Sequence, residues 1–521
     1  MNEQEFLSAL SQVDQKHIKL ARPFLRAEPN WRYFVKKSMS VTMKIIGAAA
    51  AAVIVLGLIF LPGLWQDNTP IQAASPTEEE PLRICIDLCN PVIDPNPANR
   101  AIQQFRAQLK KIGLEHVKIE SIPRGGERRE LMITRLRTEI MAGDGPDVLI
   151  LSNYAWADGE MKSLVPYPEK AMADGKFLDL TGYLERPSYM KPEELTETVL
   201  KGGQYDGKQM ILPLTYRFQS AVFLQKDVAP PEAMTWDECI KSGDPAHRYA
   251  AGYSNFITGS MQGYLSQVMG KAVDYESGTL NFSKEEMEQV ITAVIEAKEK
   301  NDQPERAARG TMGLQYGVSM EWDCQALFPD SDWEEKWLKT SKGQLSKTGL
   351  FGNSPDPHTE FESDEGITYF PLYNRQGGVT AEINYWAAVS ATTEYPDDAF
   401  LVLDFLLSRE EQMKKGRPEQ SLYGFMLGTT TFPILNDAGG PENPISKWYL
   451  NEKSFAAMDQ VKRQINAVTF HTPIDKKLQS LLMNCLFAYE DSQENGKNWR
   501  EEIKQPIDSI YEEMELLAAE S

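Results

Sequence analysis

A chain of 521 residues, 42% of them hydrophobic, can bury a large core and is too long for one ordinary domain, so we expect two lobes. The net charge of −21 argues against nucleic acid or an anionic membrane surface as the partner of the bulk of the protein. The five histidines lack the spacing of metal ligands, and the chain contains no HExxH, GxSxG, P-loop or EF-hand motif. We therefore expect no metal ion, no cofactor and no catalytic residues.

The N-terminal part differs from the rest in charge and hydropathy. Residues 1–44 carry eight basic and four acidic side chains, a net charge of +4, and residues 6–26 can form an amphipathic helix. Residues 45–64 contain no charge and would span about 30 Å as a helix, the thickness of a bilayer's hydrocarbon core. The basic residues precede this segment. They predict a single transmembrane helix with a cytoplasmic N-terminus and an extracellular main domain in the cell membrane.

A polar, proline-containing linker follows the apolar segment at residues 65–80 and should be extended. The alternative to a transmembrane helix is a signal peptide cleaved near Ala73 and Ala74. The apolar run is long for such a peptide and is preceded by a long N-terminal segment, so we favour the transmembrane helix.

After residue 80, the chain alternates strands with helices, which is typical of a parallel sheet. The expected elements are a strand at 82–88, a helix at 98–112, a strand at 117–122, a helix at 127–142 and a strand at 148–151. The second helix should bury Met132, Leu136 and Ile140, and Gly143 can take the left-handed conformation that ends it. Open sheets of this class bind ligands beyond the carboxyl ends of their strands, so we expect the site there.

The residues LRTEIMAGDGPDVLIL at 136–151 resemble the signature of extracellular solute-binding proteins of ABC transporters, in the branch that includes sugar-binding members. Later segments resemble the family in the same order, namely YDGKQMILP at 205–213, MTWDE at 234–238 and DFLLSREEQ at 404–412. The resemblance covers roughly residues 81–517. It implies an α/β, two-lobed, periplasmic-binding-protein-like fold whose lobes are joined by hinge crossovers.

The resemblance also implies domain boundaries. The first lobe comprises about 81–213 and 372–430, and the second comprises about 214–371 and 431–521. The crossings should lie near 211–227 and 361–371, and the segment TFHTP at 469–473 should approach the cleft.

Candidate ligand contacts lie in segments that the resemblance places around the cleft. Aromatic residues would stack on the ligand and polar residues would form hydrogen bonds to it. The aromatic candidates are Tyr154, Trp156, Tyr216, Trp322, Tyr385 and Trp386, and the polar candidates are Asn153, Arg217, Asn255, Asp323 and Glu382. Trp322 is the leading stacking candidate, and Tyr385 and Trp386 should stand at the cleft end of a strand. For each of these residues, packing of the lobe or an ordinary surface position is the alternative.

Two local patterns make further predictions. Thr235 with Glu238 and Ser283 with Glu286 have the spacing of capping boxes, which begin helices. The five cysteines are an odd number, and Cys85 and Cys89 would be about 13 Å apart on one strand, too far for a disulfide. We therefore expect buried thiols.

Together these features predict a membrane-tethered solute-binding protein, a monomer, that delivers a small molecule to ABC permease subunits. A sugar or oligosaccharide is favoured, with a peptide or a lipid-like compound left open. One alternative is a receptor that signals through residues 1–44. A second is a glycan-active enzyme at the cell surface, because paired carboxylates cannot be recognised in so acidic a chain.

Overall fold

The computed structural model describes most of the chain after residue 74. The described residues are 75–88, 95–123, 125–152, 163–218, 220–224, 232–241, 264–301, 367–413, 421–427, 432–438 and 452–521. They belong to one compact unit, Ala73–Ser521. The expected membrane span at 45–64 lies outside them, and no helix within the described ranges is long and apolar enough to cross a membrane.

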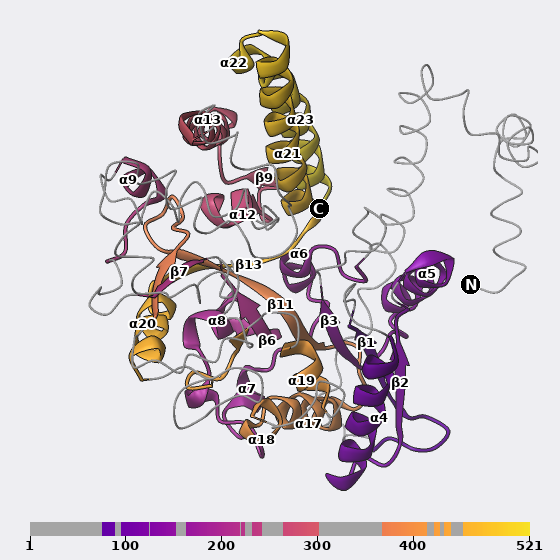
Figure 1. Ribbon diagram of the computed structural model, residues 1–521. Coiled ribbons are helices and arrows are strands. Elements are labelled where there is room, and N and C mark those ends of the chain that lie inside the picture. Colours follow the sequence, from indigo (N-terminus) through magenta and orange to yellow (C-terminus); the bar gives the residue numbers. More distant parts are fainter. Residues whose placement is uncertain are drawn as a thin grey trace, which may run out of the picture. The chain divides into compact units, whose positions relative to one another are not determined.

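A seven-stranded sheet forms the centre of the first lobe (Figure 1). Six of its strands follow the order β12-β6-β11-β3-β1-β2, and β13 pairs with β11. The strands are β1 (Leu82–Asp87), β2 (Val117–Ser121), β3 (Val148–Ser152), β6 (Ile211–Arg217), β11 (Val379–Val389), β12 (Phe432–Pro433) and β13 (Ile465–Phe470). The strand β1 is parallel to β2 and β3, and β11 is antiparallel to both β3 and β6. The four strands β1, β2, β3 and β6 therefore point the same way. The predicted parallel βαβ arrangement is confirmed.

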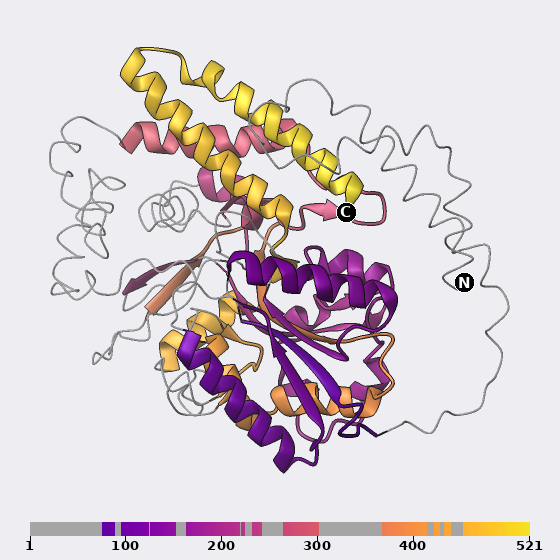
Figure 2. The same cartoon turned by 90° about the vertical axis from the view of Figure 1, so that its right-hand side faces the viewer.

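Helices cover both faces of this sheet, since alternate side chains of each strand enter two different cores (Figure 2). Ile84 and Ile86 of β1 join the core that contains side chains of α4 (Pro95–Lys111) and α17 (Pro396–Leu406). Cys85 of the same strand faces the core formed with α5 (Gly126–Ala142) and α6 (Pro168–Ala173).

The helix α5 and the strand β3 confirm the predicted helix, turn and strand, with one correction. As predicted, α5 ends at a glycine in the left-handed conformation, with φ of 87°. The helix α5 buries Leu136 as predicted, and Met132 and Ile140 are partly buried against the same core. The correction is Arg129, which was expected to be exposed and is buried. Arg129 can lie on the buried face because the carboxylate of Asp87 in β1 neutralises its charge.

Among the described residues, three connections link the sheet to the second lobe. The strand β6 leads to β7 (Ser220–Leu224), β10 (Ile367–Pro371) leads to β11, and β13 leads to α21 (Pro473–Asn495). The first two lie where the crossings are expected, and β7 pairs with β10 as an antiparallel ribbon. The strands β12 and β13 hydrogen bond within the large sheet, which differs from the expectation that the chain after residue 430 lies in the second lobe.

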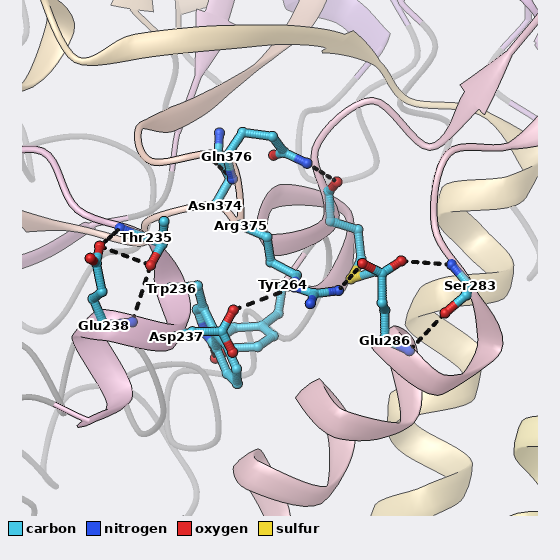
Figure 3. Close-up of polar contacts among 11 residues, drawn as sticks. Thr235, Trp236, Asp237, Glu238, Tyr264, Ser283, Glu286, Asn374, Arg375 and Gln376 are labelled. Carbon is cyan, nitrogen blue, oxygen red and sulfur yellow. Dashed lines mark hydrogen bonds and ion pairs between the residues drawn. The ribbon is translucent and has the colours of Figure 1, made fainter.

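The second lobe contains α9 (Trp236–Lys241), α12 (Tyr264–Met269), α13 (Lys284–Asn301), α21, α22 (Trp499–Glu502) and α23 (Lys504–Glu520). Three of these helices, α9, α12 and α13, contact the turn between β10 and β11 (Figure 3). In the turn, Arg375 lies 3.1 Å from Glu286 of α13 and 3.6 Å from Asp237 of α9. One arginine therefore ties the first turns of two helices to the strand that enters the sheet.

Both predicted capping boxes are confirmed (Figure 3). The backbone N–H of Thr235 donates to Glu238 at 2.8 Å, and that of Glu238 donates to the Thr235 hydroxyl at 3.2 Å. The pair Ser283 and Glu286 makes the same reciprocal bonds at 2.8 and 3.1 Å. These bonds satisfy donors at helix starts that would otherwise be unpaired.

Three thiols are buried and form no disulfide, as predicted: Cys85, Cys239 and Cys485. The remaining two cysteines lie outside the described residues.

The substitution Gly203→Ala should lower the free energy of unfolding by about 3 kcal/mol, because the added Cβ would lie 1.9 Å from the carbonyl oxygen of Ile211 at the start of β6. Gly182→Ala in α7 (Thr181–Leu184) is the matched control, since its Cβ would meet nothing within 4 Å. Urea denaturation measures both, and we expect the control to change stability by less than about 1 kcal/mol. Equal losses in the two variants would contradict this account of the close approach at Gly203.

Candidate functional site

The carboxyl ends of the parallel strands lie along one edge of the sheet, and β11 reaches past that edge. Ser152, the last residue of β3, and Thr215 near the end of β6 both lie opposite Tyr385. Residues 379–384 of β11 therefore project beyond the end of β3, and residues 379–382 also project beyond the end of β6, toward the second lobe. This is the position at which open α/β sheets bind ligands.

An ion pair between Arg217 and Glu382 is buried at this edge. Arg217 ends β6 and Glu382 lies in the projecting part of β11, with 2.5 Å between the guanidinium Nη2 and the carboxylate Oε1. Their exposed fractions are 6% and 2%. Both are candidate ligand contacts from the sequence, and the structure brings them together, so each neutralises the other.

His471 follows β13 and reaches the same pair. Thr469 of β13 lies opposite Glu382, and the Nδ1 of His471 is 3.9 Å from the Oε1 of Glu382. The imidazole is 7% exposed. The expectation that the segment 469–473 approaches this region agrees with the position of His471, although the sequence did not single out the histidine.

Asp475 begins the helix that continues from this point into the second lobe. Its carboxylate accepts hydrogen bonds from the Thr472 backbone N–H at 2.7 Å and from the Thr472 hydroxyl at 2.6 Å, which makes a capping box for α21. Burial raises the pKa of Asp475, and the carboxylate of Glu382 adds to the rise, whereas His471 and the hydroxyls of Thr472 and Ser266 oppose it. The start of α21 is therefore a buried polar junction between the sheet and the second lobe.

A second buried ion pair lies at the end of β1. Arg129 of α5 donates from Nη1 to one oxygen of Asp87 at 3.0 Å and from Nη2 to the other at 2.6 Å, and Nη1 also donates to the carbonyl of Pro123 at 2.9 Å. Both side chains are 1% exposed. Sequence reasoning missed this pair because an arginine followed by apolar residues resembles the exposed face of a helix.

The other predicted contacts divide into two groups. Tyr216, Tyr385 and Trp386 are core residues, exposed by 1% or less, and Trp386 packs against Phe177 and Phe470 with ring centroids 5.8 and 6.2 Å apart. Tyr385 and Trp386 lie within β11 rather than before an apolar strand, since the strand already begins at Val379. The remaining candidates lie outside the described residues: Asn153, Tyr154, Trp156, Asn255, Trp322 and Asp323.

The edge offers hydrogen-bond donors and acceptors held in fixed positions. Within the described ranges, no group of His, Cys, Asp and Glu side chains could hold a metal ion. A groove of about 320 Å³ elsewhere is lined by Ser283 and by residues of α13 and α23, including Lys284 and Asp508, and contains none of the edge residues. The polar edge of the sheet is therefore the stronger candidate for a binding site.

Substitution of one member of the edge pair should cost more than substitution of both. Glu382→Leu leaves the Arg217 charge buried without its carboxylate, so we expect the free energy of unfolding to fall by about 3–5 kcal/mol. Adding Arg217→Met should recover most of that loss, as measured by urea denaturation. Arg463→Met, which removes an exposed pair with Asp459, should cost less than about 1 kcal/mol. Additive losses at the two edge positions would contradict a coupled pair.

The raised pKa of Asp475 predicts a pH dependence of stability. A carboxyl group whose pKa is higher in the folded state stabilises the fold at low pH, and this contribution is lost as the pH rises through the folded-state value. Asp475→Asn keeps an oxygen acceptor for the cap but cannot ionise. Relative to the parent protein, the variant should therefore gain stability between pH 4 and pH 8 in urea denaturation. Asp491→Asn on the exposed face of α21 is the control, and parallel curves for Asp475→Asn and the parent would refute the assignment.

More than half of the sequence matches a known protein family. Residues 103–413 match the family model described as bacterial extracellular solute-binding protein, which is more than half of the chain. No significantly similar sequence was found among curated proteins.

Solved structures with a similar fold include three solute-binding proteins. An extracellular solute-binding protein family 1 from Alicyclobacillus acidocaldarius is 12% identical, with 85% of this chain and 99% of that chain covered at a TM-score of 0.48. The cyclic alpha-maltosyl-1,6-maltose binding protein of Arthrobacter globiformis is 13% identical, with coverages of 85% and 100% and a TM-score of 0.43. The sugar-binding protein MalE of Xanthomonas citri is 13% identical, with coverages of 83% and 97% and a TM-score of 0.45.

Proposed function

We propose, on the premise that this chain belongs to the bacterial extracellular solute-binding protein family, that it captures a carbohydrate between its two lobes for an ABC importer. Proteins of this family bind solutes for ABC transporters and are not enzymes. The function is therefore binding and delivery, with no bond made or broken.

The buried pair of Arg217 and Glu382 is the observation that carries the carbohydrate proposal. An ion pair at the edge of the sheet offers donors and acceptors while its two charges cancel. Sugar hydroxyls both donate and accept hydrogen bonds and bring no charge of their own, so they suit such a surface. A strongly anionic solute would instead need a cation that is not already neutralised within the protein. The resemblance of residues 136–151 to the sugar-binding branch points the same way.

Aromatic residues would supply the apolar half of the site. We assign stacking on the sugar to Tyr154, Trp156 and Trp322, and hydrogen bonds to Asn153, Asn255 and Asp323. Tyr154 and Trp156 come directly after β3, and therefore after the carboxyl end of a parallel strand. Flat aromatic rings bury the apolar face of a sugar, while the amide and carboxylate groups select among its hydroxyls.

Residues 45–64 would tether the protein to the cell membrane as a single transmembrane helix. The absence of charge over 20 residues and the basic side chains on the N-terminal side support this topology. The solute-binding unit would then stand outside the cell as a monomer, next to the permease subunits that receive the solute.

A thermal unfolding screen of the protein in detergent micelles tests the solute class. A ligand present at about 100 times its dissociation constant adds about 2.7 kcal/mol to the free energy of unfolding, which raises the unfolding midpoint. We expect neutral oligosaccharides to raise it, and uronic acids and peptides to leave it unchanged.

The matched control is the double variant Arg217→Met with Glu382→Leu, which should fold but lose the shift. A peptide that raises the midpoint when no sugar does would refute the carbohydrate proposal. Chromatography of the bound sugar should recover it intact, because the protein binds without catalysis.

A further inference from the structure

The two lobes touch through side chains at a β-hairpin of the second lobe. The hairpin consists of β8 (Val273–Asp274) and β9 (Thr279–Leu280). Its tip is fixed by Asp274, which accepts hydrogen bonds from the backbone N–H of Glu276 and the hydroxyl of Ser277, both at 2.9 Å. Gly278 completes the turn with φ of 65°. The side chains at the tip are therefore presented from a rigid support.

Three side chains of the hairpin region meet three of the first lobe. Lys271 lies 3.1 Å from Glu169 of α6, and the hydroxyl of Tyr205 in β4 (Gln204–Tyr205) donates to Glu276 at 3.3 Å. The rings of Tyr167 and Tyr275 meet edge to face, with centroids 6.1 Å apart. The contacts thus combine an ion pair, a hydrogen bond and an aromatic pair.

Each partner is anchored in its own lobe. In the first lobe, Met172 of α6 is buried in the core that contains Leu149 and Trp386 of the sheet. In the second lobe, the backbone of Asn281 donates to Ala272 at 3.0 Å and its side chain donates to the carbonyl of Lys271 at 3.1 Å. Movement of one lobe relative to the other must therefore break or displace these contacts.

These contacts between the hairpin and the first lobe also lie next to the polar edge of the sheet. Burial raises the pKa of the Tyr275 phenol, and the side chain of Thr472, the residue that caps α21 next to His471, is close enough to Tyr275 to oppose that rise. Glu169 is close enough to Asp475 for their charges to interact. The segment 471–475 therefore lies next to the contacts of the hairpin with the first lobe and next to the ion pair of Arg217 with Glu382.

We propose that the β8–β9 hairpin is a latch that holds the lobes in the arrangement described here, through Glu169, Tyr205 and Tyr167 of the first lobe. The contacts are noncovalent. The side chain of Glu169 is only 14% exposed, but that of Lys271 is 52% exposed, so water can solvate the ammonium group when the ion pair breaks. Loss of one such pair shifts a two-state equilibrium by about two- to fivefold, which suits a device that biases closure without locking it. The use of this latch in solute capture rests on the proposed function, whereas its effect on the lobes does not.

The test measures the distance between the lobes without any solute. Spin labels attached to unnatural amino acids at the exposed positions Ser188 and Glu494 report this distance in the full-length protein by pulsed electron resonance. Lys271→Glu places two carboxylates against each other, and should shift the distance distribution by raising a second population at least about fivefold. Combining Lys271→Glu with Glu169→Lys restores opposite charges and should restore the parent distribution.

Lys284→Glu is the matched control, because the pair of Lys284 with Asp508 at 2.8 Å lies wholly within the second lobe. It should leave the distribution unchanged. Tyr205→Phe removes one hydroxyl with little risk to folding, and should shift the distribution in the same direction as Lys271→Glu but less. A distribution that Lys271→Glu and Tyr205→Phe leave unchanged, or that the charge swap does not restore, would overturn the latch. If no sugar raised the unfolding midpoint, the proposed function would be contradicted, but the effect of the latch on the lobes would not.

Discussion

Two opposite charges buried at the edge of a sheet are tolerated only if each satisfies the other, and this requirement shapes the centre of the molecule. Arg217 ends β6, and Glu382 lies where β11 passes the ends of its neighbours. Removing either charge would leave the other buried without the opposite charge that it pairs with here. The register of β11 against β6 is therefore constrained by electrostatics as well as by apolar packing, since a slip of one residue would turn Glu382 to the other face.

The same strand carries the connection between the lobes. The turn before β11 is held by helices of the second lobe through Arg375, and the strand then crosses the middle of the first-lobe sheet. The neighbouring strand β13 leads through His471 into α21, which belongs to the second lobe. Two elements that begin or end in the second lobe thus lie side by side at the polar edge. A change in the angle between the lobes must act on this edge, and hence on any solute bound there.

Sequence patterns predicted the structure correctly where a conformation depends on residues that are close together in the chain. The capping boxes at Thr235 and Ser283, the end of α5 at Gly143 and the parallel βαβ opening were all predicted and are confirmed, because each depends on residues a few positions apart. The positions of Tyr385 and Trp386 could not be decided from the sequence. An aromatic residue beside an apolar run can stack on a ligand or pack in the core, and only the pairing of β11 with strands on both sides shows that these two rings fill the core.

The amino-acid sequence by itself determined the α/β class, the family, the βαβ opening of the first lobe and the starts of α9 and α13, since hydrophobic periodicity and capping are local properties. It could name Arg217 and Glu382 separately, but it could not pair residues 165 positions apart. It could not find the pair of Arg129 with Asp87 or the contacts of the β8–β9 hairpin with α6 and β4. These were decided by tertiary structure alone, because the energy of a buried charge depends on which partner the fold brings within hydrogen-bond distance.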